Sequence, residues 1–101
     1  MSADMFRKPW QSVSSAQGAA LVQEVNAEIS LDHPLNGMID GAIARSSSAD
    51  DVLFRLSDNR VADVHLTWTH KTERLPWPRH TIFASLAQWI EKVMIPVQGE
   101  Q

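Results

Sequence analysis

Two stretches of alternating residues, 51–56 (DVLFRL) and 61–68 (VADVHLTW), constrain the fold of this chain more than any other feature. In both, apolar side chains at even positions alternate with a wetter set at odd positions. A period of two indicates a β-strand with one buried face. The short polar link Ser57-Asp58-Asn59 between them predicts an antiparallel hairpin.

Parity defines the register of this hairpin. Directly opposed residues share a face, so the numbers of each opposed pair must sum to an even value. Loops of two or four residues are therefore excluded, and a three-residue loop at 57–59 is expected, with Asn59 in the left-handed conformation. The pairs expected in this register are Phe54 with Ala62, Val52 with Val64, and Asp51 with His65, while Arg55 lies diagonal to Asp63.

Two segments have helical periodicity. In the first, Ser14 is the expected N-cap and Gln17 completes a capping box. In the second, Ser85 and Gln88 form the same pattern, and Pro96 ends the helix. The apolar stripes are Leu21, Val22, Val25 and Ile29 in the first segment, and Leu86, Trp89, Ile90, Val93 and Met94 in the second.

The segment 38–45 (MIDGAIAR), which Gly41 interrupts, is a weaker strand candidate, and 80–84 (HTIFA) slightly favours an extended conformation. The order helix, three-stranded meander, optional short fourth strand, helix predicts an α+β fold. We expect a two-layer sandwich, with the N-terminal and C-terminal helices on the same apolar face of the sheet.

The expected domain boundaries follow from these elements. Residues 15–96 form one α+β domain, 97–101 a polar C-terminal tail, and 1–14 a flexible N-terminal arm. Three large apolar residues, Met5, Phe6 and Trp10, leave open the alternative that the arm docks on the domain or on a partner.

Composition excludes several function classes. The 101 residues include no cysteine, which excludes disulfides, thiolate metal sites and a cysteine nucleophile. A net charge of −3 gives no bulk attraction to nucleic acid or anionic membrane. The N-terminus lacks a secretory pattern and no apolar run could span a bilayer, so we expect a cytoplasmic protein without a cofactor. The element order also matches the double-stranded-RNA-binding fold, but the second helix lacks the basic start such domains need, so nucleic acid is an unlikely partner.

Several motifs resemble a group of small bacterial proteins without assigned function. They are the strand "DDVLF", the strand "VHLTW", the Trp-Pro loop "PWP" and the helix start "FASLAQW". The stretch "DHPLNG" is also similar, and the likeness covers about residues 20–94. The resemblance implies a compact single domain and no particular activity.

The outer, odd-numbered face of the hairpin carries one candidate site. His65 oriented by Asp51, with Asp63 nearby, could act as a general base in a small enzyme or as part of a metal site. The alternative is a solvated face whose charges pair weakly across strands. No histidine pair has the helical spacing of a zinc site, so no metal is expected. Leu53 and Val61 share this face and, together with Arg55, would give it an exposed contact surface.

The loop from His70 to His80 is the second candidate site. Trp77 sits between two prolines, which either plug its ring into the edge of the core or display it for recognition. Arg74, Arg79 and His80 flank it, and residues 64–80 carry a net charge of +2. We therefore favour a non-catalytic interaction module over an enzyme. Its partner is expected to be another protein or a second copy of this chain.

Overall fold

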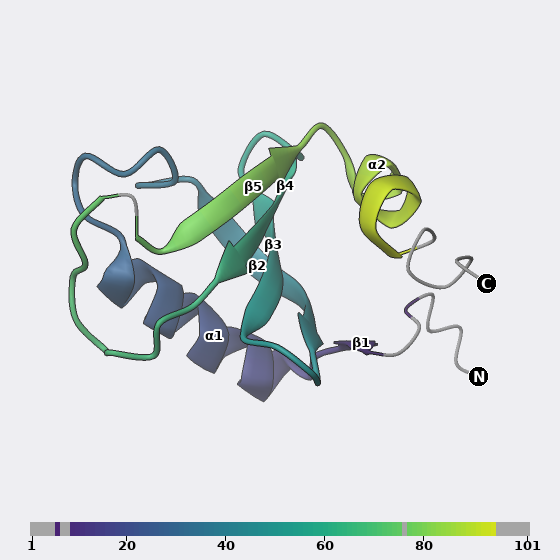
Figure 1. Ribbon diagram of the computed structural model, residues 1–101, viewed down its shortest axis with the longest axis horizontal. Coiled ribbons are helices and arrows are strands. Elements are labelled where there is room, and N and C mark those ends of the chain that lie inside the picture. Colours follow the sequence, from purple (N-terminus) through teal and green to yellow (C-terminus); the bar gives the residue numbers. More distant parts are fainter. Residues whose placement is uncertain (1–5, 7–8, 76, 95–101) are drawn as a thin grey trace.

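The computed structural model describes residue 6, residues 9–75 and residues 77–94 (Figure 1). It is an α+β fold built on a five-stranded antiparallel sheet whose strands follow one another in chain order. The strands are β1 (Trp10–Ser12), β2 (Ile39–Ser46), β3 (Asp51–Leu56), β4 (Val61–His65) and β5 (Arg79–Phe83). The helices are α1 (Ser15–Glu28) and α2 (Leu86–Trp89), which continues into the π-helical turn η1 (Ile90–Met94).

The β3–β4 hairpin has the register that parity predicts. All three expected pairs are present: Phe54 with Ala62, Val52 with Val64, and Asp51 with His65. The Leu56 N–H donates to the Arg60 carbonyl at 2.8 Å and closes a three-residue loop. Asn59 has φ 73°, the left-handed conformation expected of it. The weaker strand candidates are also strands, β2 and β5.

Helix α1 covers the even-numbered face of the sheet. Ser14 caps it as expected: its hydroxyl accepts from the Gln17 N–H at 3.1 Å, while the Gln17 side chain accepts from the Ser14 N–H at 3.0 Å. The buried residues of this first core are Leu21, Val25, Ile29, Leu35, Val52, Phe54, Leu56, Ala62, Val64 and Leu66. Trp68 packs against this core and is partly buried.

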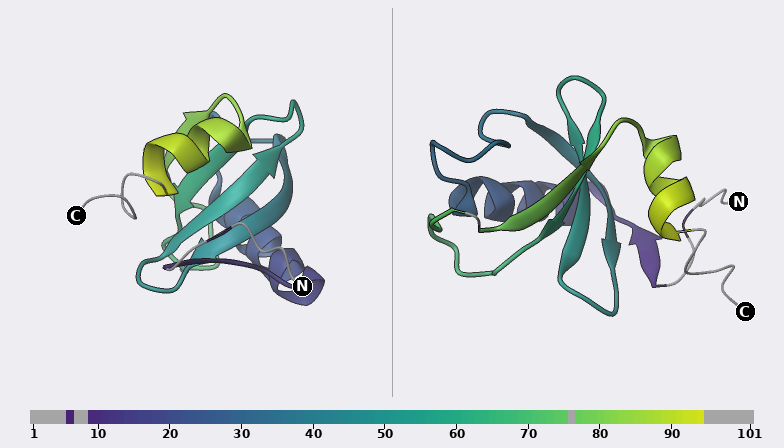
Figure 2. Two further views of the ribbon diagram at one scale, coloured as in Figure 1. Left: turned by 90° about the vertical axis from the view of Figure 1, so that its right-hand side faces the viewer. Right: turned by 45° about the horizontal axis from the view of Figure 1, so that its top comes forward.

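The second helix lies on the opposite face, so the expectation of both helices on one side was wrong. Trp89 of α2 is fully buried and packs with Leu53 and Val61, which are 0% and 2% exposed. The right-hand view of Figure 2 shows the strands between α1 and α2. Leu53 and Val61 therefore belong to a second core and do not form an exposed contact surface. Apolar residues on both faces of β3 and β4 require a cover on each side.

Part of the N-terminal segment docks on this second core. Trp10 is buried, pairs with Ser46 at the edge of the sheet, and meets the Trp89 ring edge-on at 4.8 Å between centroids. The Phe6 ring lies 5.8 Å from that of Trp89. The docked alternative thus holds for Phe6 and Trp10–Ser12. The described residues do not include 1–5 and 7–8 of the arm, nor the tail at 97–101.

Within the described part of the chain, neither helix has the length and apolar character needed to cross a bilayer.

Candidate functional site

An open groove of about 810 Å³ lies on the odd-numbered face of the sheet, in the part that α2 leaves uncovered. Its lining residues are Asp51, Asp63, His65, Trp77, Arg79, His80, Thr81, Phe83 and Val93. They come from β3, β4 and β5, from the loop before β5, and from η1. The groove thus unites the two candidate sites of the sequence, the outer hairpin face and the Trp77 loop.

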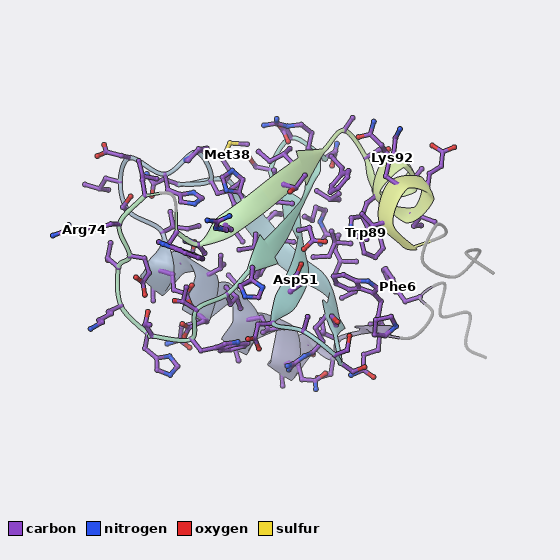
Figure 3. The ribbon with its side chains drawn as sticks, in the orientation of Figure 1. Phe6, Met38, Asp51, Arg74, Trp89 and Lys92 are labelled. Carbon is purple, nitrogen blue, oxygen red and sulfur yellow. The ribbon has the colours of Figure 1, made fainter. Side chains whose placement is uncertain are left out.

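Strand register places the polar groups of this groove. Asp51 lies opposite His65, His65 opposite Arg79, and Asp63 opposite Thr81. All five have odd numbers, so all project from the same face. Figure 3 shows Asp51, the first residue of β3, and Trp89 between the strands and α2.

Asp51 and His65 form a hydrogen-bonded pair. The His65 Nδ1–H donates to Asp51 Oδ1 at 2.8 Å, and 48% of the His65 side chain remains exposed. Burial alone would raise the pKa of Asp51, but hydrogen bonding with Asp63 and His65 outweighs it and lowers that pKa. Because Nδ1 is directed to the carboxylate, Nε2 is the imidazole nitrogen left to interact with a ligand.

The pKa of Asp63 is shifted in the opposite direction. Burial, together with the neighbouring Asp51 carboxyl, raises the pKa of Asp63 to about 8. The Trp89 Nε1–H donates to its Oδ2 at 3.2 Å, while its buried Oδ1 accepts from no donor among the described residues. A proton on Oδ1 would let Asp63 donate to Asp51. At neutral pH the two carboxyls therefore hold one proton between them.

Trp77 forms an aromatic part of the groove wall. Trp77 is 38% exposed, and the Arg79 guanidinium carbon lies 4.9 Å from the centre of its ring. The Trp77–Pro78 peptide bond is cis, and Pro78 is buried. The Trp77 N–H donates to the Arg74 carbonyl at 2.8 Å. The ring thus borders the groove, next to a buried proline and a backbone hydrogen bond.

The remaining predicted binding residues lie elsewhere. The side chain of Arg74 is exposed and points away from the sheet (Figure 3). Arg55 pairs with Asp40 of β2 at 3.1 Å rather than lying toward Asp63. Neither arginine lines the groove.

His80 borders the groove, but its ring lies 4.8 Å from the ring of buried His33. Burial and the neighbouring His33 lower the pKa of His80. His33 bridges two segments, since its Nδ1 accepts from the Leu35 N–H and its Nε2–H donates to the Pro78 carbonyl, both at 3.1 Å. This pair therefore helps to fix the chain next to Trp77.

Two buried carboxylates of α1 hold the start of the same loop, and the sequence interpretation missed them. Glu28, 0% exposed, accepts the backbone N–H groups of Thr67 at 2.9 Å and Trp68 at 2.8 Å. Glu24, 5% exposed, accepts the His70 N–H at 3.0 Å and also bonds the His70 ring. Their i, i+4 spacing among the apolar residues of α1 is the signal that could have revealed them.

This carboxylate clamp, Glu24 and Glu28, restrains an otherwise unfavourable backbone. Trp68 and His70 both have φ 61°, a conformation that costs about 1 kcal/mol or more for a non-glycine residue. Burial and the neighbouring Glu24 raise the pKa of Glu28. Burial opposes ionisation of Glu24 as well, but hydrogen bonds with Glu28 and His70 lower its pKa.

The described residues contain no group of three or more histidine, cysteine, aspartate or glutamate side chains arranged to hold a metal ion. In the groove, His65 directs Nδ1 to Asp51 instead. No protein-family model matches the chain, and no curated protein or solved structure is significantly similar to it.

Proposed function

We propose that this protein is an interaction module that binds an extended segment of a partner protein in the groove on the odd-numbered face. The observation that carries the proposal is that the groove lies directly beside β5, an edge strand. Among the described residues β5 pairs with β4 alone, so one of its edges is unpaired. An unpaired edge can accept a peptide as an added strand.

The lining of the groove supports this type of ligand. Trp77, Phe83 and Val93 provide apolar surface, and the carboxyl pair Asp51 and Asp63 provides polar contacts. Tryptophan and arginine contribute strongly to interface affinity, and Arg79 lies against the Trp77 ring. The groove is open rather than enclosed, which favours an extended chain over a fully buried small molecule.

Selection from a displayed library of random peptides tests the proposal. Binders should be enriched, and Trp77→Ala should weaken their binding at least tenfold. Leu75→Ala is the matched control, because Leu75 is an exposed apolar residue of the same loop that does not line the groove. Failure to enrich any peptide, or equal losses in both variants, would rule the proposal out. Light scattering would show whether the partner is instead a second copy of the chain.

Acid–base catalysis is a second candidate function, favoured by the Asp51–His65 hydrogen bond. An imidazole oriented by a carboxylate is a potential general base, and Asp63, protonated at neutral pH, is a potential general acid. Mass spectrometry of the selected peptides after incubation separates the two functions. Intact peptides indicate binding alone, whereas cleavage that His65→Gln abolishes indicates an enzyme.

A further inference from the structure

We propose that the carboxyl pair Asp51 and Asp63 selects the bound segment by receiving one of its basic side chains, a lysine or an arginine, in exchange for the proton that the pair holds. This inference rests on the proposed peptide-binding function and names the chemistry that the groove recognises.

The first support is the lack of a strong cation beside the pair. Among the described residues, Asp51 forms one ion pair, with His65, and Asp63 forms none. Arg79 lines the same groove, but its guanidinium stacks on Trp77. Within the described part of the chain, the two adjacent carboxyls thus face the groove with no lysine or arginine paired to them.

The second support is that Oδ1 of Asp63 has no partner among the described residues other than the proton it shares with Asp51. Oδ2 of Asp63 is occupied by the Trp89 indole, whereas buried Oδ1 accepts from no described donor. An ammonium or guanidinium group carries several donors and could serve both Oδ1 and the Asp51 carboxylate. The shared proton is a single donor between the two carboxyls, whereas a basic side chain brings several.

The surroundings of the pair fit the rest of such a side chain. Phe83 and Val93 line the groove with it, and Asp63 lies opposite Thr81 in the middle of β5. The methylene stem of lysine or arginine packs well on apolar surface while its charged end meets a carboxylate. A metal ion is a poorer occupant, because His65 directs Nδ1 to Asp51 and the described residues offer no three-ligand group.

Proton release gives the exchange a measurable signature. With the pKa of Asp63 at about 8, about ten molecules are protonated for each ionised one at pH 7. Binding of a cation in place of the proton should therefore release about 0.9 proton per site at pH 7. Binding of a neutral analogue should release none.

The probes are Nα-acetyl-lysine methylamide and its norleucine analogue, which differ mainly in the ammonium group. We expect NMR titration to show saturable shifts at Asp63 and His65 with the lysine probe, with affinity about fivefold higher than for norleucine. A pH-stat measures the released proton. Equal affinities, or lysine binding without proton release, would overturn the inference.

Asp63→Asn is the decisive variant, because asparagine resembles the neutral carboxyl and can still accept from Trp89. It should abolish both the lysine preference and the proton release. Asp51→Asn, on another strand, should reduce both, because burial still raises the pKa of Asp63 when the neighbouring charge is gone. Asp40→Asn, on β2 outside the groove, should retain both. If library peptides bind without a basic residue, the inference fails while the proposed function stands. If no peptide binds, the proposed function fails.

Discussion

Replacing Glu28 by alanine should destabilise the protein by about 2 kcal/mol. The substitution removes the acceptor of the Thr67 and Trp68 N–H groups, whose bonds measure 2.9 and 2.8 Å. A hydrogen bond to a charged group contributes about 1.5–3 kcal/mol, and the low end applies because Thr67 and Trp68 are only half-buried. Two such bonds give about 3 kcal/mol. The substitution also removes a buried carboxyl whose ionisation is opposed by burial and by Glu24, and this offsets part of the loss, which leaves about 2 kcal/mol.

Urea unfolding followed by tryptophan fluorescence measures this loss, and amide hydrogen exchange locates it. Thr67 and Trp68 should lose protection before the residues of β3 do. Glu28→Gln separates the lost acceptor from a cavity, because it keeps the volume but turns a donor toward one of the N–H groups. Gln23→Ala, at an exposed position of α1, is the control. A loss below about 0.5 kcal/mol in both Glu28 variants, or unchanged protection at Thr67, would refute the clamp.

Three further predictions concern the rest of the molecule. The first concerns Asp63, whose pKa is raised to about 8 in the folded protein, so its contribution to stability is complete below its unfolded pKa and is lost as pH rises toward 8. In urea titrations, the free energy of unfolding of Asp63→Asn should therefore increase relative to that of the wild type between pH 4 and 8. A difference that does not change with pH would contradict the assignment. The His80 ring should titrate below about 6.5 by NMR and rise toward that value in His33→Ala, since the neighbouring His33 contributes to the lowering. Leu53→Ala should lower the free energy of unfolding by about 2–4 kcal/mol, because it leaves a cavity in the second core. The control Arg55→Ala, at an exposed position of the same strand, should change it by less than about 1 kcal/mol. Equal losses in the two variants would place Leu53 outside the core.

The β3–β4 register was predictable because parity and loop geometry act over a few neighbouring residues. Val52, Phe54 and Asn59 each restrict the pairing locally, and no distant contact is needed. The capping of α1 by Ser14 was predictable for the same reason.

The face on which α2 packs was not predictable from local pattern. Leu53 and Val61 alternate with charged residues, and two isolated apolar groups on a polar face do not reveal that a helix covers them. The cover also requires Trp10, which is distant in sequence and lies in a segment expected to be flexible. Such long-range packing depends on the whole chain.

The candidate site was predictable in part. Asp51, Asp63 and His65 follow from strand parity, and Trp77 from its two prolines. Their meeting in one groove depends on β5 returning beside β4, which brings Arg79 opposite His65. The strongly raised pKa of Asp63 depends in addition on burial next to Asp51, which spacing alone cannot show.

The two edges of the sheet differ in a way that bears on self-assembly. One edge is β1, only three residues long, and the other is β5, with five residues and Arg79 at its start. A continuous fibre forms when one sheet edge of each molecule pairs with the opposite edge of the next molecule, because such pairing does not close into a finite assembly. The shortness of β1 disfavours that growth, while β5 pairing with its own copy would close on itself as a dimer. With these unequal edges, the strand addition proposed at β5 would occur while polymerisation is disfavoured.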